Sequence, residues 1–569
     1  MSLRTLNLTS MLLPLVLAAV LLLPGGRTMA EEAATHQQQQ AATLLKIARE
    51  TLAAEAPEVK RPAEDLPRPS VVFLSLTRTA QAAVIGIGVA DTLEDATRLA
   101  AQDLRDEATF GDLATGRLRI DFVHQAKLPQ PAGEPRPLKV LPSPVGLMFV
   151  RGDWLFVPED TNLAVAQSPA VSFASWIETP DGLLQLYEGS PLVSDTSPAH
   201  LLAACTAGGD YLLRGLLLDG KFDYLYDAAT NESVDDYNLV RHAGACGALA
   251  EIQLAVNQEA TRQGRAVPQS QPYLEGSRRG LDYLLRNYAS GPYQDNPNQD
   301  FTTIISNGQV SELGATALTL LAMTKCHNVS ADSADLDLMR QLGKFILHQQ
   351  QPDGRFLPYY YFLDHDGEQP ESQYYPGEAI LALTRLARID PSGPWLAAAQ
   401  KGADYLIDIR DAGIPMDELY HDHWLLISLN QLTDLTDNPR YIAHAEKLGT
   451  SICNLQVRQS ERLDWIGTYY QPPRSNPTAC RGEALVAMIE LARREKLDDR
   501  RYLETMARTA ALQLRFQITA NSGIYLPRPD LATGGFRGTY SDWNIQIDTV
   551  QHNVSSLLGY RALQLGKKK

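Results

Sequence analysis

The chain has few cysteines and few basic residues for its 569 residues, and no long apolar segment follows its N-terminus. The cysteines number five, which is odd, and show no Cys-x-x-Cys spacing, so a disulfide framework is not expected. Lysine and arginine total 51 against 67 acidic residues, a formal net charge of −16. Nucleic-acid binding requires clustered basic side chains, so the charge argues against a nucleic-acid partner.

The first 30 residues have the organisation of a secretory signal peptide. Arg4 provides the positive charge, Met11 to Pro24 is an apolar run, and Thr28-Met29-Ala30 resembles a cleavage site. A retained membrane anchor is the alternative, but a span needs about 20 apolar residues and this run is shorter. We therefore expect an exported protein, periplasmic or extracellular, with no transmembrane segment after cleavage.

Residues 31–69 are predicted to contain a helix and a proline-rich linker, and residues 70–190 a small α/β domain. Val- and Ile-rich runs predict strands, and helical periodicity predicts one helix between them. The expected elements of this domain are strands at 70–76, 83–89 and 117–125, a helix at 93–106, and a hairpin at 147–157 that turns at Gly152-Asp153.

This order of elements, with the segment GIGVADTLEDATRLAAQDLRDEATFGDL that starts at Gly86, resembles the AMMECR1-like domain over residues 41–185. The resemblance implies a fold only. The Arg-Gly-Cys-Ile-Gly stretch of that family is replaced here by Val84-Ile85-Gly86-Ile87-Gly88, so a function tied to its cysteine does not transfer.

From residue 196 to residue 569 the sequence repeats a pair of helices six times. The second helix of each pair is rich in Ala, Gly and Leu, as expected for a helix packed on both sides, and the first carries more charge. Second helices are expected to begin at Arg241, Ser311, Pro376, His421, Arg481 and Asp548. Such pairs cannot stand alone, and six of them predict a closed (α/α)6 toroid, with an open solenoid as the alternative.

The pattern resembles the broad (α/α)-toroid group of glycoside hydrolases, polysaccharide lyases, sugar 2-epimerases, terpenoid cyclases and lanthionine cyclases. The segment FILHQQQPDGRF (Phe345–Phe356) is similar to a hairpin junction common to several of them. Terpenoid cyclases need an Asp-rich motif, and no DxDD or DDxxD occurs here. Lanthionine cyclases bind zinc through a lone Cys and a Cys-His pair, whereas Cys480 is followed by Arg481. The resemblance therefore favours the sugar-active members.

In such a toroid the N-terminal ends of the inner helices meet at one mouth. Glu378 and Glu483 occupy equivalent places in related repeats (PGEAILAL and RGEALVAM) and could provide the two carboxyl groups of a glycosidase. In a lyase or epimerase, a histidine or tyrosine would abstract a proton while an arginine neutralises a carboxylate. Acidic residues at helix N-termini also stabilise the helix dipole, which is a purely structural alternative.

These considerations give a set of candidate site residues at the funnel mouth. The catalytic candidates are Glu378, Glu483, His242 and His423, and the substrate-binding candidates are Arg241, Glu312, Arg481, Tyr375, Tyr469, Asp548, Gln551 and His552. No cofactor and no metal are expected. The sequence His421-Asp422-His423 looks like a metal motif, but residues i and i+2 of a helix point about 200° apart.

Two functions follow from the sequence. The first is an exported glycan-active enzyme, a hydrolase, lyase or epimerase, acting in the toroid funnel, with an anionic polysaccharide as a candidate substrate. The second is a non-catalytic periplasmic or surface protein that binds a glycan or peptide.

Overall fold

The computed structural model describes residues 29–53, 70–77, 83–123, 147–150, 153–156, 174–187, 189–292, 299–306, 309–331, 335–362, 369, 371–460, 462–540 and 542–566. The predicted signal peptide lies outside these residues, apart from Met29 and Ala30 at the start of helix α1 (Met29–Ala53). Among the described helices, none is both long enough and apolar enough to cross a bilayer. Export stays a prediction.

The N-terminal part of the chain forms a five-stranded antiparallel sheet in the order β2-β1-β3-β6-β7. Strand β1 lies between β2 and β3 and is buried along its whole length, as its Val- and Leu-rich sequence favours. The elements of this part are α1, β1 (Ser70–Thr77), β2 (Val84–Ala90), α2 (Leu93–Glu107), α3 (Phe110–Thr115), β3 (Arg117–Val123), β4 (Leu147–Val150), β5 (Asp153–Phe156), β6 (Ala174–Thr179) and β7 (Gly182–Leu186).

Helix α2 packs directly on strand β2 because two strand glycines leave room for it. A Cβ atom on Gly88 would lie 1.8 Å from the carbonyl oxygen of Ala96, and one on Gly86 would lie 2.0 Å from that of Ala100. The expected strands, helix and hairpin are present. The hairpin turn differs from the prediction, because Asp153 is the first residue of β5 and pairs with Val150.

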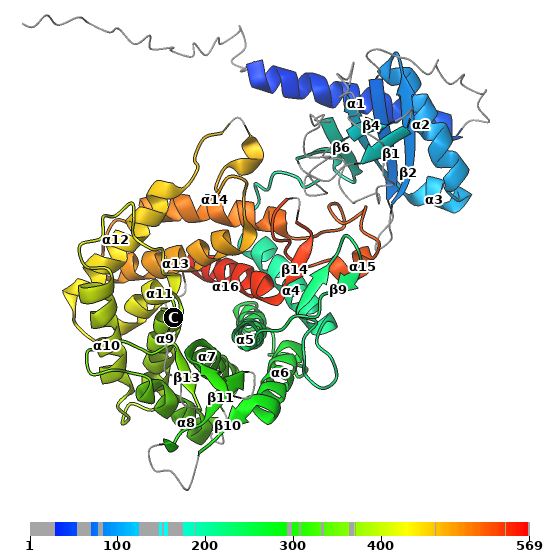
Figure 1. The fold of residues 1–569 in the computed structure, drawn as a ribbon. Helices are drawn as coiled ribbons and strands as arrows, with labels where there is room; N and C mark the ends of the chain where they lie inside the picture. Colours follow the sequence, from blue (N-terminus) through cyan, green and yellow to red (C-terminus); the bar gives the residue numbers. More distant parts are fainter. Residues whose placement is uncertain are drawn as a thin grey trace, which may run out of the picture.

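The C-terminal part of the chain forms a ring of paired helices (Figure 1). Each of the six inner helices among the described residues packs against the next, and the last, α16, packs against the first, α5. This contact closes the ring and excludes the open solenoid. The inner helices are α5 (Leu239–Arg262), α7 (Leu313–Val329), α9 (Tyr375–Ile389), α11 (His423–Leu432), α13 (Ser475–Arg494) and α16 (Ile547–Gln564).

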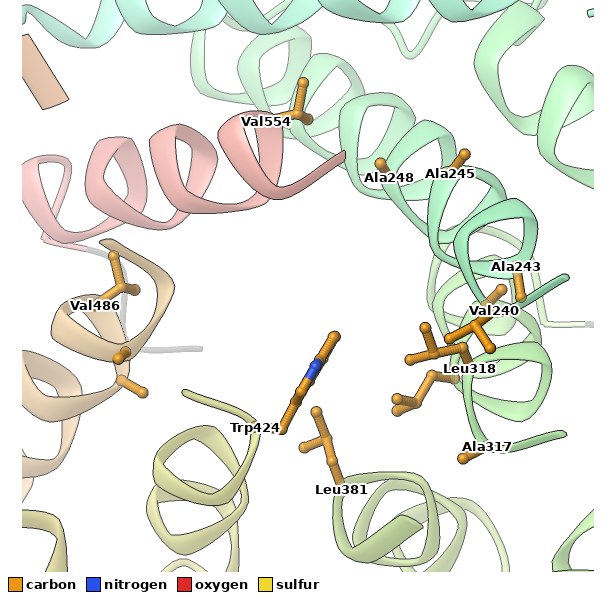
Figure 2. Packing of buried hydrophobic residues seen from close by; sticks show 14 of the residues in the cluster. Val240, Ala243, Ala245, Ala248, Ala317, Leu318, Leu381, Trp424, Val486 and Val554 are labelled. Carbon is orange, nitrogen blue, oxygen red and sulfur yellow. The ribbon is translucent and has the colours of Figure 1, made fainter. Parts of the chain in front are cut away.

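Each inner helix is preceded in the chain by an outer helix that packs against it. The outer helices are α4 (Pro198–Arg214), α6 (Pro272–Tyr288), α8 (Asp335–His348), α10 (Trp395–Tyr405, continued by a π-helical turn at Leu406–Arg410), α12 (Pro439–Leu455) and α14 (Arg500–Phe516). The small side chains of the inner helices allow close packing on both sides, and Figure 2 shows several of them around the ring. The predicted repeat of six helix pairs is therefore confirmed.

Short elements connect the helices on the side where the inner helices begin. They are β8 (Leu225–Asp227), β9 (Glu232–Ser233), β10 (Ala289–Ser290), β11 (Thr303–Ser306), β12 (Val310–Glu312), β13 (Tyr359–Tyr361), β14 (Asn544–Gln546), the 3-10 turn Leu463–Trp465 and α15 (Pro529–Ala532). Strand β14 pairs with β8 and so joins the last helix pair to the first.

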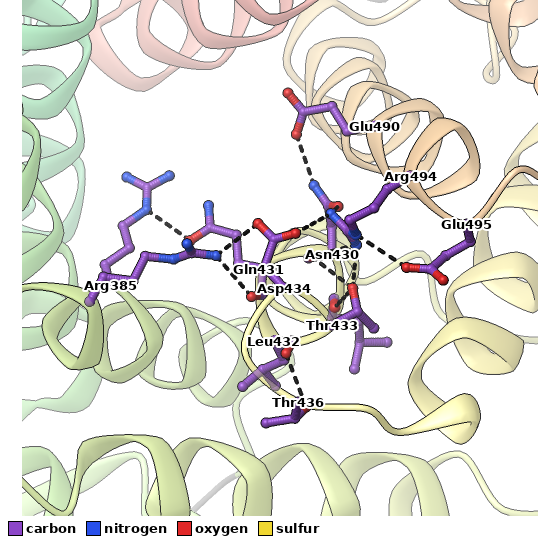
Figure 3. A network of polar contacts seen from close by, with 12 residues as sticks. Arg385, Asn430, Gln431, Leu432, Thr433, Asp434, Thr436, Glu490, Arg494 and Glu495 are labelled. Atoms are coloured by element: carbon purple, nitrogen blue, oxygen red, sulfur yellow. Dashed lines mark hydrogen bonds and ion pairs between the residues drawn. The ribbon is translucent and has the colours of Figure 1, made fainter. Parts of the chain in front are cut away.

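Polar side chains connect the inner helices in their C-terminal halves (Figure 3). Asn430 donates a hydrogen bond to Glu490 at 2.8 Å, and Arg494 forms an ion pair with Asp434 at 2.8 Å. Because these groups satisfy one another across the helices, they hold neighbouring inner helices together at the end of the ring away from the helix starts.

The sheet and the ring contact each other through the loop that follows α14. The hydroxyl of Tyr525 lies 2.7 Å from Ser75 Oγ and donates to Asp121 at 3.2 Å. The guanidinium of Arg119 stacks over the Tyr525 ring at 4.8 Å and forms a buried ion pair with Asp121 at 2.8 Å. A residue of the helical part thus completes a polar network inside the sheet.

Candidate active site

A cavity of about 1180 Å³ lies where the inner helices begin. Every inner helix contributes a lining side chain from its first two turns. Examples, one from each helix in chain order, are Arg241, Leu318, Glu378, His423, Arg481 and Asp548. Figure 2 shows Trp424 extending into the interior of the ring. The helix starts therefore share one opening, as expected from the sequence.

The cation at the start of α5 is held by a carboxylate at the start of α16. Arg241 Nε lies 3.0 Å from Asp548 Oδ2, and Asn476 of α13 donates to the same oxygen at 2.8 Å. A positive charge at a helix N-terminus is unfavourable by itself. The facing carboxylate compensates for it, so Arg241 and Asp548 form part of the cavity wall as a neutral pair.

A second guanidinium in the wall has neutral partners. Arg481 donates to the His421 ring at 3.1 Å, to the Pro477 carbonyl at 2.9 Å and to the Tyr470 hydroxyl at 3.0 Å. Its guanidinium stacks over the Tyr470 ring at 5.0 Å, and that of Arg474 lies 5.5 Å from the same ring. Within the described part of the chain, no ion pair neutralises Arg481. The guanidinium of Arg481 therefore lies beside Tyr470 without an ion-pair partner among the described residues, in a wall that also includes Asp417, Glu418 and Asp542.

Glu378 is a buried carboxyl group in the first turn of α9. Its side chain lines the cavity, yet the residue is only 4% exposed, and Oε2 has no hydrogen-bond partner among the described residues. Gly314 makes room for it, because a Cβ atom there would lie 2.6 Å from Oε2. Burial raises the pKa of Glu378 to about 8, against a smaller opposing effect of His552. The carboxyl group is protonated at neutral pH.

This pKa makes stability depend on pH. The folded state keeps the Glu378 proton up to about pH 8, whereas the unfolded chain loses it near the ordinary value of 4.5. The folded state binds more protons over this range, so stability falls as the pH rises through it. Asp422 and Glu312 face the group and add to the shift.

We expect Glu378→Gln to change stability by less than about 1 kcal/mol at pH 5 and to raise it at pH 9 by an amount on the order of 4–5 kcal/mol. Denaturant unfolding measures the free energy of unfolding of both proteins at each pH. A chelator is present so that no bound metal ion changes the electrostatic potential at Glu378. An equal difference at both pH values would contradict the assignment.

Four further side chains meet beside Glu378, on α11, α13 and α16. We name them the His-Cys-Glu-His cluster: His423, Cys480, Glu483 and His552. Each offers one nitrogen, sulfur or oxygen atom, and these four atoms lie within 4.8 Å of one another. Glu483 Oε2 lies 2.8 Å from His552 Nδ1 and 3.7 Å from His423 Nε2. Burial lowers the pKa of His423; that of His552 is raised despite burial, because Cys480 and Glu483 face it.

Four of the predicted site residues do not line the cavity: Glu483, which belongs to the His-Cys-Glu-His cluster, and three that lie elsewhere. His242 is enclosed between the Tyr237 hydroxyl and the Gly280 carbonyl, and burial lowers its pKa to about 4. Glu312 accepts a hydrogen bond from the Tyr375 hydroxyl at 2.7 Å and so supports a lining residue from behind. Tyr469 contacts Thr509 at 2.7 Å in the interior. Each of these three side chains is therefore held by neighbouring groups outside the cavity, and its predicted role stays a prediction.

The other predicted residues come together. Eight of them line the cavity: Glu378, His423, Arg241, Arg481, Tyr375, Asp548, Gln551 and His552. Glu483 lies behind the wall, against His423 and His552. Sequence reasoning missed Cys480 because α13 begins at Ser475, six residues before the expected start at Arg481. On the longer helix, the spacing Cys480-x-x-Glu483 places both side chains on one face. That spacing is the sequence feature from which the pairing of Cys480 with Glu483 could have been predicted.

No protein-family model matches the chain, and no curated protein matches it. Solved structures that resemble it include an inactive α-1,6-mannanase of a Salegentibacter species in complex with α-1,6-mannotriose, at 13% identity and TM-score 0.43. That comparison covers 64% of this chain and 99% of the mannanase.

Two further solved structures are a D-mannose isomerase, at 12% identity and TM-score 0.47, and the cellobiose 2-epimerase of Bacillus thermoamylovorans, at 12% and 0.46. They cover 65% and 64% of this chain, and 99% and 100% of their own chains. At such low identities and scores, these similarities carry no inference about activity.

Proposed function

We propose that the chain is a glycan-active enzyme whose reaction takes place in the funnel of the ring, on a sugar that carries an anionic group. The observation that carries the proposal is Glu378, a buried carboxyl group with an unpartnered oxygen at the wall of a large cavity. A protonated carboxyl group in such a place can donate a proton to a glycosidic or hydroxyl oxygen. Export of the enzyme, predicted from the N-terminal sequence, is part of the proposal.

The remaining wall supports a sugar ligand. Tyr374, Tyr375 and Trp424 line the same cavity, and such rings can stack on sugar faces while polar groups bind hydroxyls. Arg481 and Arg474 flank Tyr470, which places positive charge where a carboxylate or sulfate of the substrate would bind. The group that accepts a proton, or activates water, would then come from the His-Cys-Glu-His cluster beside Glu378.

The proposal is tested by incubating the full-length protein with acidic and neutral polysaccharides and oligosaccharides. New reducing ends report hydrolysis, ultraviolet absorbance of an unsaturated uronate reports elimination, and altered sugar composition reports epimerisation. We expect one of these signals with an acidic glycan. Tight glycan binding without any of the three signals would instead identify a non-catalytic binding protein.

Arg481→Gln is expected to raise KM for the anionic glycan by roughly 10–100-fold, because a hydrogen bond to a charged group contributes about 1.5–3 kcal/mol. Turnover at saturation should change much less, since the guanidinium binds the substrate away from the proton donor. Steady-state kinetics separate the two effects. Arg500→Gln is the matched control, because Arg500 is exposed and pairs with Asp498 on an outer helix. Equal effects of both substitutions would contradict the role of Arg481.

A further inference from the structure

We propose that His423, Cys480, Glu483 and His552 form a binding site for one transition-metal ion of the zinc type at the wall of the funnel. Each residue offers one donor atom, and the four atoms lie within 4.8 Å of one another. The proposal adds a metal to the cavity that the proposed enzyme function uses, but binding itself requires no glycan.

The helices bring these donors together in a way that the chain order does not suggest. Cys480 and Glu483 are three positions apart on α13 and therefore lie on one face, about one turn apart. His423 is the first residue of α11, and His552 is in the second turn of α16, the two helices that flank α13 in the ring. Three neighbouring helices thus direct four donors to one point.

The distances are close to those of a tetrahedral zinc site. Zinc binds sulfur at about 2.3 Å and nitrogen or oxygen at about 2.0–2.2 Å, which places neighbouring donors about 3.5 Å apart. Glu483 Oε2 is already 3.7 Å from His423 Nε2, and the largest separation in the cluster is 4.8 Å at most. Small side-chain rotations suffice to bring all four donors to an ion.

His423 provides an independent observation. Its side chain is 3% exposed, and neither ring nitrogen has a hydrogen-bond partner among the described residues. A buried imidazole with both nitrogens unpaired is unfavourable, because the hydrogen bonds that water would make are lost. An ion bound at Nε2 would compensate for this loss.

The donor set selects the class of ion. One thiolate, two imidazoles and one carboxylate favour zinc and similar transition metals over magnesium or calcium, which prefer oxygen donors. His423, Cys480 and His552 line the cavity, so a fifth coordination position would face the substrate. A water molecule bound there would be more acidic than free water.

The competing arrangement is a nucleophile triad. His552 hydrogen-bonds Glu483 at 2.8 Å and also faces Cys480, as the base of a cysteine nucleophile would, although the Cys480 thiol donates to Asn476 at 3.3 Å. A triad leaves His423 without a role, whereas the metal site uses all four residues. The geometry for this reason favours the metal.

The full-length protein, stripped with EDTA, is titrated with zinc chloride by calorimetry and with cobalt chloride by absorbance. We expect one zinc ion per chain and a thiolate-to-cobalt charge-transfer band. Cys480→Ser should remove the band, and His423→Gln should weaken zinc binding more than the 10–100-fold typical of outer-shell partners. His421→Gln is the matched control and should still bind one ion, because His421 points to Ser451 and Arg481.

A second measurement follows the reactivity of Cys480. Zinc should slow the alkylation of Cys480 in the parent protein and raise its unfolding temperature. Uptake of much less than one ion, or equal zinc binding by the parent, Cys480→Ser and His423→Gln, would overturn the site. Rapid alkylation of Cys480 that zinc does not slow, but that His552→Gln suppresses, would overturn it in favour of the triad. Zinc binding without glycan turnover would overturn only the proposed function.

Discussion

Glu378→Gln is expected to lower turnover of the accepted glycan by about 10²–10⁴-fold, the usual contribution of a positioned general acid or base. Glutamine has nearly the same shape and fits beside Gly314, but it cannot donate the proton that the buried carboxyl group holds. The affinity for the glycan should change little, because the amide keeps most contacts of the acid. Steady-state kinetics and equilibrium binding measure the two quantities separately.

Glu371→Gln is the matched control for this substitution. Glu371 is exposed just before α9 and does not line the cavity, so its replacement should leave turnover unchanged. If Glu378→Gln retained the turnover of the parent, the carboxyl group would have no role in proton transfer. Its burial would then reflect packing alone, and the proposed function would lose its main support.

Asp121→Asn is expected to lower the free energy of unfolding by about 3–5 kcal/mol, because it leaves Arg119 as a buried charge without a counter-charge. The two side chains are 0–1% exposed and form a two-point contact, with Nη2 and Nε of Arg119 at 2.8 and 2.9 Å from the carboxylate oxygens. Tyr525, from the helical part, donates to the same carboxylate. The loss should therefore loosen both the sheet and its contact with the ring.

The control for this prediction removes a similar charge at the surface. Asp95 pairs with Arg98 on α2, and both side chains are more than 40% exposed, so Asp95→Asn should change stability by less than about 1 kcal/mol. Replacing both buried partners, in Arg119→Met with Asp121→Leu, should cost less than Asp121→Asn alone. Denaturant unfolding compares the variants. A double variant less stable than the single one would show that the ion pair itself is strongly stabilising.

The ring was predictable because its signal is repeated. Several inner helices carry similar runs of small apolar residues, as in Ser311–Ala322 and Pro376–Ala387, and a helix buried on both sides requires neighbours. Polar residues at the starts of these helices predicted a shared cavity for the same reason. The number of helix pairs and the position of the cavity could be predicted from the repetition along the chain. No individual contact between residues had to be known for either prediction.

The side-chain assignments within the mouth were less predictable, because one residue of offset rotates a helical side chain by about 100°. Arg241 faces the cavity and pairs with Asp548, whereas its neighbour His242 points toward α6 and the Gly280 carbonyl. Tyr470 lines the cavity and Tyr469 is interior. The packing of neighbouring helices determines which of two adjacent side chains faces the cavity. That packing cannot be derived from the sequence pattern alone.

The His-Cys-Glu-His cluster was missed for two reasons. The expected start of α13 at Arg481 left Cys480 in a loop, although Pro477 is compatible with the first turn of a helix that begins earlier. Its four members also lie far apart in the sequence, from residue 423 to residue 552. The comparison with lanthionine cyclases looked for a histidine directly after Cys480, whereas the histidines come from other helices. The predicted AMMECR1 resemblance of the N-terminal part stays a prediction.

The most direct test of a reaction in the funnel is a crystal structure of the Glu378→Gln protein soaked with an oligosaccharide that the parent converts. The account predicts the reacting sugar oxygen within hydrogen-bond distance, about 3 Å, of the side chain at position 378, with the anionic group of the sugar on Arg481. A sugar bound outside the cavity, or inside it with the reacting atoms far from position 378, would contradict the account.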